Sequence, residues 1–374
     1  MSSATDNIRQ IFSDEYVREK CFSLWEAHLQ WLHECGFERA LQVDSNPVVP
    51  CTSTGHEVVD LLALFVQSTG LVNAHLGLTS SDVIDNVRLM QVNASVEVIH
   101  TRLFEMVGWF QSRLDVDEDT VGFTHWQPAA PITWRHRMRA WLEPIELLLE
   151  RRPQVHAKQF GGPVGDARSL RRIVSDVKTF EWSHFHLAYP ANQFPIQSSD
   201  HLDELAAVGW CCVVAAQVHK IAQDLRFLAS RRTIVIGRKP DHAGSSSMPH
   251  KTNPYKWEKV CSCCRSLSTT HQEVWSVMAH NSLERTLDTS WQLKHALQRC
   301  FETLAIALDE MLAVEFEVHV SNTQVETMLS ASDIASDARL MERILGGGES
   351  RWFAYLSMLN HTNQQHKRQE KTKS

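Results

Sequence analysis

The sequence has 374 residues, a formal charge of −7 at pH 7, 43% hydrophobic residues and 22% charged residues, as in ordinary soluble globular proteins. A domain that binds nucleic acid is usually more basic than this. The longest apolar stretches, at residues 61–66 and 208–216, are far shorter than the roughly 20 residues that cross a bilayer, and no apolar secretion segment opens the chain. We therefore expect a cytoplasmic protein that binds neither nucleic acid nor membrane.

Helical periodicity is the dominant pattern in the chain. A short helix is expected over residues 58–66, and apolar residues recur at steps of three and four over residues 89–110 and again over residues 207–228. Such long runs without an interior proline indicate a bundle of long helices, so we predict an all-α fold. The fragment RTIVIGR at residues 232–238 is strand-like but isolated.

The nine cysteines are expected to be reduced, because no signal sends them to an oxidising compartment. The cluster Cys261, Cys263 and Cys264 and the pair Cys211 and Cys212 lack the CxxC spacing of a zinc site. We interpret them as packing residues on helices, and the sequence implies no metal.

Three stretches interrupt the helical pattern with turn and capping residues. TSSD at residues 79–82 opens the first long helix. GFTHWQPAAP at residues 122–131 is an extended approach to a helix expected from Thr133 onward. PDHAGSSSMPHKTNP at residues 240–254 precedes a helix expected from about Tyr255. In a helix bundle, such breaks are places where side chains can build a site.

The third stretch carries the most specific chemistry. Its glycine lets the backbone approach a ligand, its serines supply hydroxyl groups, and amides near a helix N-terminus favour an anion. Lys251 adds a positive charge. Taken alone, the stretch could also be a flexible Gly/Ser surface loop.

The motif GSSSMPHKTNP closely resembles the signature loop of the fumarase, aspartase and argininosuccinase superfamily. HLGLTSSDVIDN at residues 75–86 and GFTHWQPAAP resemble the first and second conserved regions of that superfamily, in the expected order. Within it the chain is most similar to adenylosuccinate lyases of the animal type, through GHEVV around His56 and ERTLDTSW at residues 284–291. The matches span roughly residues 50–295.

The resemblance implies a three-part fumarase/aspartase-like fold. Its parts would be an N-terminal helical domain (residues 1–78), a central long-helix bundle carrying the signature loop (79–319), and a shortened C-terminal helical domain (320–374) with a disordered tail. It also implies a homotetramer in which three subunits contribute to each active site.

The activity implied by the resemblance is the elimination of fumarate from a small-molecule N-succinyl adduct, without a cofactor. Ser245 would remove the proton, and His125 would protonate the departing nitrogen. Lys251, Asn253 and the loop amides would stabilise the charge that develops on the carboxylate.

Further positions match substrate-binding residues of the family. They are Thr79, Ser80, Thr124, His56, Gln193, Arg285, Ser290 and Lys294. Purely structural interpretations stay open for several of them. Thr79 and Ser80 could do no more than cap a helix, and His56 and Arg285 could be solvated surface groups.

Departures from the family pattern lie at the nucleotide end of the site. No Arg-Tyr pair precedes the FSD stretch at residues 12–14, Lys294 replaces the usual arginine, GGPVGD stands at residues 161–166, and the third domain is short. Two alternatives therefore stay open. One is a superfamily enzyme acting on argininosuccinate, aspartate or a carboxymuconate. The other is a non-catalytic structural protein, against which the intact Ser245 and His125 argue.

Overall fold

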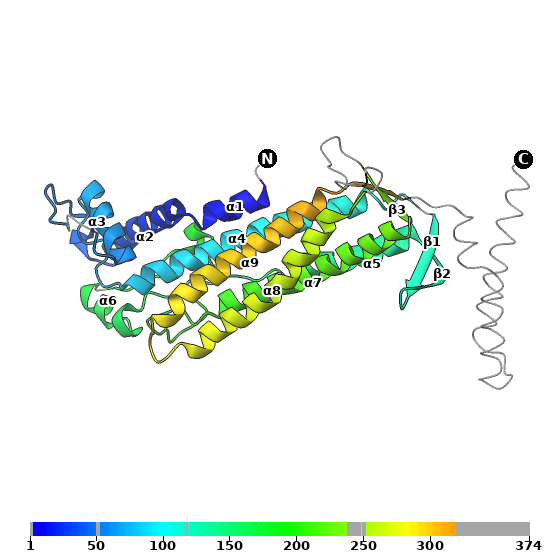
Figure 1. Cartoon of the computed structure of the whole chain (residues 1–374). Helices are drawn as coiled ribbons and strands as arrows, with labels where there is room; N and C mark the ends of the chain where they lie inside the picture. The colour runs from blue at the N-terminus through cyan, green and yellow to red at the C-terminus, as the bar shows by residue number, and fades with distance from the viewer. Residues whose placement is uncertain are drawn as a thin grey trace, which may run out of the picture.

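The computed structural model describes residues 3–49, 53–116, 118–174, 176–237, 248 and 252–318. In this part of the chain, long helices run side by side along the length of the molecule (Figure 1). These are α4 (Ser80–Gln111), α5 (Trp134–Glu150), α7 (Leu202–Ser230), α8 (Tyr255–His280) and α9 (Asp288–Leu312). The predicted all-α bundle is confirmed.

The core of the bundle follows from the helical period. In α4, Val92, Val96, Ile99 and Leu103 recur at steps of three and four and are fully buried, because those positions share one face of a helix. Helix α8 packs against both α7 and α9, and α9 packs against α4. Each long helix thereby buries a stripe of apolar side chains against its neighbours.

Two N-terminal helices, α1 (Ala4–Ile11) and α2 (Asp14–Glu34), pack against the bundle. The carboxylate of Asp309 in α9 accepts hydrogen bonds from the backbone N–H of Thr5 at 3.1 Å and from its hydroxyl at 2.7 Å. The same carboxylate binds Arg102 of α4 at 2.6 Å. One acidic side chain thus connects α1, α4 and α9.

The two ends of the bundle differ. At one end lie α3 (Glu57–Thr69) and α6 (Arg168–Ile173), and at the other lies an antiparallel hairpin of β1 (Asp119–Thr124) and β2 (Gln127–Thr133) (Figure 1). A second antiparallel pair joins β3 (Ile234–Ile236) to β4 (Phe316–Val318). The strand-like fragment near residue 234 is therefore a paired strand, because β4 returns to it from the end of α9.

The two strands of the hairpin approach each other closely at a bulge. Its register shifts between Gly122 and Phe123, and a Cβ on Gly122 would lie 2.6 Å from the carbonyl oxygen of Ala130. Only glycine fits this bulge without a backbone shift. The sequence indicated an extended segment here, but the pairing of its two halves was not predicted.

The starts of several helices agree with their sequence signals. Helix α5 begins after Thr133, whose hydroxyl oxygen accepts a hydrogen bond from the backbone N–H of His136 at 3.2 Å. Helix α8 begins at Tyr255, as expected. The predicted C-terminal domain, residues 320–374, lies outside the described residues.

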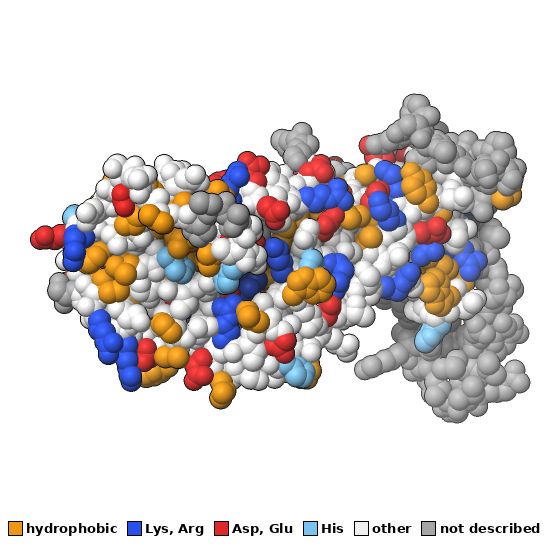
Figure 2. Space-filling view, turned by 60° about the vertical axis from the view of Figure 1, so that its left-hand side comes forward, with side chains coloured by type: hydrophobic (Ala, Val, Ile, Leu, Met, Phe, Trp, Pro, Cys, Tyr) orange, Lys and Arg blue, Asp and Glu red, His pale blue; other side chains and the backbone are white. Residues whose placement is uncertain are grey.

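Among the described helices, α7 is long and apolar enough, by length and composition, to cross a membrane. Half of its most apolar window is buried, where α7 packs against α5, α8 and α9. Its position in the bundle core accounts for this composition. On the face shown in Figure 2, basic and acidic side chains are interspersed with hydrophobic ones.

His28 is a fully buried histidine in α2. Its Nδ1–H donates to the carbonyl oxygen of Ala74 at 3.0 Å, and its ring packs against those of Trp31 and Phe160. Within the described residues Nε2 has no hydrogen-bond partner. Burial lowers the pKa of His28 to about 4.

This lowered pKa predicts a loss of stability in mild acid. At pH values between about 4 and 6.5, the ring of His28 is protonated in the unfolded chain but neutral in the folded protein. The free energy of unfolding therefore falls as the pH falls through this range. We expect His28 to account for about 2 kcal/mol of the decrease in unfolding free energy between pH 7 and 5. Urea titrations should show a correspondingly shallower pH dependence in His28→Leu. An unchanged dependence would contradict the assignment.

Candidate functional site

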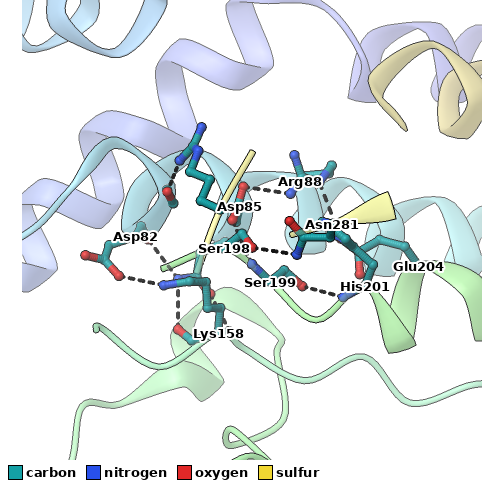
Figure 3. Close-up of polar contacts among 12 residues, drawn as sticks. Asp82, Asp85, Arg88, Lys158, Ser198, Ser199, His201, Glu204 and Asn281 are labelled. Carbon is teal, nitrogen blue, oxygen red and sulfur yellow. Dashed lines mark hydrogen bonds and ion pairs between the residues drawn. The ribbon is translucent and has the colours of Figure 1, made fainter. Parts of the chain in front are cut away.

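A buried carboxylate organises the end of the bundle near α3 and α6. Asp82 in the first turn of α4 is fully buried and accepts a hydrogen bond from the backbone N–H of Thr79 at 2.9 Å. It also accepts from the N–H groups of Gly161 at 2.9 Å and Gly162 at 3.0 Å. The Nζ of Lys158 lies 2.6 Å from Oδ1, which makes a buried ion pair (Figure 3).

The spacing of the TSSDVIDN motif explains this arrangement. Asp82, Asp85 and Asn86 are three and four residues apart, so they share one face of α4. The side-chain amide of Asn86 donates to the carbonyl oxygen of Lys158 at 2.9 Å and accepts from its backbone N–H at 2.8 Å. The first two turns of α4 therefore fix the backbone around Lys158 as well as its ammonium group.

A second buried network begins at Asp85. Arg88 binds Asp85 at 2.7 Å and Glu204 of α7 at 3.4 Å, while Nδ1 of His201 lies 3.2 Å from Glu204 (Figure 3). Burial by itself raises the pKa of Glu204, but the hydrogen bond and charge of His201, with the charge of Arg88, lower it to about 2. Asp85 also accepts the N–H of Ser199 at 2.9 Å, so the network fixes the segment before α7.

A small cavity of about 80 Å³ lies between these networks, and its lining includes the polar side chains of Lys158, Ser198, Asp200 and Asp203. Asp203 accepts the backbone N–H of His156 at 2.6 Å and lies 3.1 Å from its Nδ1. Burial raises the pKa of Asp203 against the opposing effect of this contact.

The loop between α8 and α9 joins the same region. Asn281 donates to the hydroxyl of Ser198 at 2.9 Å (Figure 3), and the N–H of Ser198 donates to the carbonyl oxygen of Glu284 at 3.3 Å. The guanidinium of Arg285 donates to the hydroxyl of Ser81. Arg285 is therefore half-buried beside the N-terminus of α4, not a freely solvated charge.

Several other predicted residues lie at this end. Thr79 is the residue directly before α4, and its hydroxyl donates to the carboxylate of Asp82 at 3.2 Å. Ser80 is the first residue of α4 and Ser290 lies in the first turn of α9. Lys294 pairs at 3.5 Å with Glu57, which follows the exposed His56 at the start of α3.

Two further residues join this group that were not singled out from the sequence. Nδ1 of His75 accepts the indole N–H of Trp25 at 3.2 Å, which leaves the other nitrogen as its N–H donor. Burial lowers the pKa of His75, which interacts electrostatically with Asp82 and His56. His75 is part of the quoted HLGLTSSDVIDN motif, and that membership was the signal that could have identified it.

The second such residue is Gln197. Its side-chain amide donates to the carbonyl oxygen of Pro163 at 2.6 Å, in the glycine loop that Asp82 holds. The predicted Gln193 instead lines a separate aromatic cavity.

The remaining described site residues lie at the opposite end. His125 and Trp126 form the two-residue turn of the hairpin with φ of 51° and 65°, a left-handed conformation that is unusual for such residues. The ring of Trp126 lies 4.7 Å from that of Phe227, which helps to hold the turn. His125 and Thr124 are exposed at its tip.

Asn253 precedes α8 at the same end and lines a small cavity with Gly237 and Trp257. Ser245 and Lys251 lie outside the described residues. Helix α8 has 26 residues, which corresponds to about 39 Å, so Asn253 and Arg285 are separated by almost the length of the bundle. One chain therefore does not bring all the predicted residues together.

A family model described as a lyase matches residues 35–267. The chain belongs to this lyase family, which confirms the resemblance noted from its motifs. Adenylosuccinate lyase of Pyrococcus abyssi is 28% identical over 250 residues, covering 64% of this chain and 54% of that protein. The enzyme of Saccharomyces cerevisiae is 28% identical over 257 residues, with 64% and 52% covered. The chain thus spans about half the length of these relatives.

Solved structures with more distant sequences share the fold. The 3-carboxy-cis,cis-muconate lactonizing enzyme from Pseudomonas putida has a TM-score of 0.69 at 18% identity, covering 94% of this chain and 84% of that one. A fumarate lyase from Mesorhizobium sp. BNC1 has a TM-score of 0.69 at 17% identity, with 96% and 87% covered.

The buried pair Lys158–Asp82 predicts a large stability effect. Lys158→Met leaves the carboxylate of Asp82 buried without its counter-charge, so we expect a loss of about 3–5 kcal/mol in unfolding free energy. The matched control is Lys294→Met, which breaks an exposed ion pair and should cost about 1 kcal/mol or less. Urea denaturation measures both. Equal losses in the two variants would show that Asp82 does not depend on Lys158.

Proposed function

We propose that the protein is a lyase that releases fumarate from an N-succinyl adduct, with adenylosuccinate as its substrate and AMP as the other product. The observation that carries this proposal is the family match together with adenylosuccinate lyase relatives that align with much of the chain. The three motifs noted in the sequence supply the residues that such an elimination requires.

In the proposed reaction, Ser245 takes the proton from the carbon next to a carboxylate of the succinyl group. The C–N bond breaks as the C=C bond of fumarate forms, and His125 protonates the departing nitrogen. Lys251 and Asn253 stabilise the negative charge that develops on the carboxylate. The exposed position of His125 at the hairpin tip supports its role as a group presented to a ligand.

The opposite end of the bundle supplies the binding side of the proposed site. The N-terminus of α4 with Ser80, and the guanidinium of Arg285 beside it, form an arrangement that favours an anion. When the ligand binds, the ammonium group of Lys294 would leave Glu57 and pair with the ligand instead. Thr79, Thr124, Gln193, His56 and Ser290 complete the proposed substrate-binding set.

The separation of these two groups supports a shared active site. Helix α4 has 32 residues, about 48 Å of helix, and the two groups lie at opposite ends of the bundle. A substrate of nucleotide size does not span this distance. We therefore place the complete site between subunits of a homotetramer, where the hairpin end of one chain meets the α4 N-terminus of another.

Incubation with adenylosuccinate tests the proposed substrate. Fumarate is followed by its ultraviolet absorbance and AMP by chromatography, and we expect equal amounts of both. Turnover of another N-succinyl adduct without turnover of adenylosuccinate would reject the substrate and keep the reaction. Failure with every adduct would reject the proposed lyase activity.

The acid and the base should each be essential. We expect His125→Ala and Ser245→Ala each to lower kcat by about 100-fold or more, because each removes a proton transfer from the transition state. His136→Ala is the matched control, since His136 is exposed on α5 close to the hairpin and should leave kcat near normal. Near-normal turnover of His125→Ala would contradict its assignment as the acid.

A mixing experiment tests the shared site. If His125 and Arg285 reach one site from different chains, inactive His125→Ala and Arg285→Gln proteins should recover activity after subunit exchange. Random 1:1 assembly gives intact pairs in about one quarter of the sites. Mass spectrometry verifies that exchange has occurred. Exchange without recovered activity would place both residues of each site on one chain.

A further inference from the structure

An aromatic cavity of about 480 Å³ lies beside α2 and α6, outside the proposed catalytic groups. Trp31, Phe160, Phe180 and Trp182 form its walls, and Tyr189 stands at its mouth with 48% of its surface exposed. Its volume falls in the range of about 300–1,000 Å³ that is typical of small-molecule sites.

The walls of this cavity are held in place by mutual ring packing. The ring of Phe180 lies 4.8 Å from that of Phe160 and 4.5 Å from that of Trp182. The indole N–H of Trp31 donates to the carbonyl oxygen of Lys178 at 2.9 Å. The N–H of Lys178 donates to Sγ of Cys35 at 3.3 Å. A planar ring entering the cavity would therefore meet preformed aromatic surfaces, which favours binding.

Two cations, Arg171 and Lys178, also line the cavity. Neither forms an ion pair with an acidic side chain of the described residues. Glu181, one of the acids close in sequence to the lining, accepts the hydroxyl of Tyr189 at 2.8 Å and the N–H of Ser183 at 3.1 Å. The cavity thus combines aromatic walls with positive charge that lacks a counter-ion in this part of the structure.

A larger cavity between α2 and α4, of about 950 Å³, shows the contrast. Its cations are paired, because Arg152 binds Glu97 at 2.6 Å and Lys20 binds Glu19 at 3.2 Å. Of these two cavities, the aromatic one has cations without an acidic partner among the described residues. We therefore take it as the candidate site for an anion.

We propose that the aromatic cavity is a second ligand-binding site, which takes a planar aromatic molecule carrying a phosphate or carboxylate group. The ring contacts the uncovered parts of Trp31, Phe180 and Trp182, which are 3–8% exposed, and the anionic group binds Arg171 and Lys178. None of the residues assigned to proton transfer lines this site, but Gln193 of the proposed substrate-binding set does, so binding and lyase activity are measured separately.

Isothermal titration calorimetry with 1-naphthyl phosphate tests the proposal on the full chain. We expect saturable binding that is at least 10-fold tighter than that of 1-naphthol or inorganic phosphate alone. Arg171→Gln/Lys178→Gln should weaken binding at least 10-fold. Arg172→Gln is the matched control, because Arg172 is an exposed residue of the same helix outside the lining, and it should change Kd less than twofold.

Two further variants test whether the ligand binds in the aromatic cavity. Val177→Glu places a negative charge at an exposed position of the lining and should also weaken binding at least 10-fold. Arg285→Gln should leave the affinity unchanged, because Arg285 is not part of the lining. Absence of saturable binding, equal affinity in the double variant, or weaker binding in Arg285→Gln would each overturn the proposal. Lyase activity measured separately distinguishes this failure from failure of the proposed reaction.

Discussion

The buried carboxylate of Asp82 is the contact on which the α3 end of the molecule depends. Removing such a charge from water costs several kcal/mol unless its oxygens are fully bonded. Here the Lys158 ammonium group and backbone N–H groups from both sides offset that cost. The requirement to satisfy this charge fixes the glycine loop against α4. It thereby also fixes the N-terminus of α4, where Ser80 and Arg285 lie.

The loop held by Asp82 separates two different environments. Its backbone N–H groups at Gly161 and Gly162 point to the carboxylate, while the ring of Phe160 packs with Phe180 and Trp182 on the aromatic side. One segment of chain thus forms a boundary of both the polar region near α4 and the aromatic cavity. Gln159 lines both the small cavity of about 80 Å³ beside Lys158 and the aromatic cavity.

The lengths of the helices determine how far apart the two groups of predicted residues lie. Straight helices such as α4 and α8 bury their apolar stripes along their whole length, so their ends cannot approach one another within a chain. The strained His125–Trp126 turn and the α4 N-terminus are each well formed, yet far apart. The two groups of predicted residues could therefore act on one substrate only through contact between copies, as proposed.

The sequence by itself determined the long helices, the helix starts near Thr79, Thr133 and Tyr255, and the family, because helical periodicity, capping residues and ordered motifs are local signals. Only the tertiary structure revealed the pairing of β3 with β4, the roles of Lys158 and Gln197, and the aromatic cavity. These depend on contacts between segments far apart in the chain, such as Asp82 with residues 158–162. No local pattern encodes which distant backbone N–H group or ammonium will satisfy a buried carboxylate.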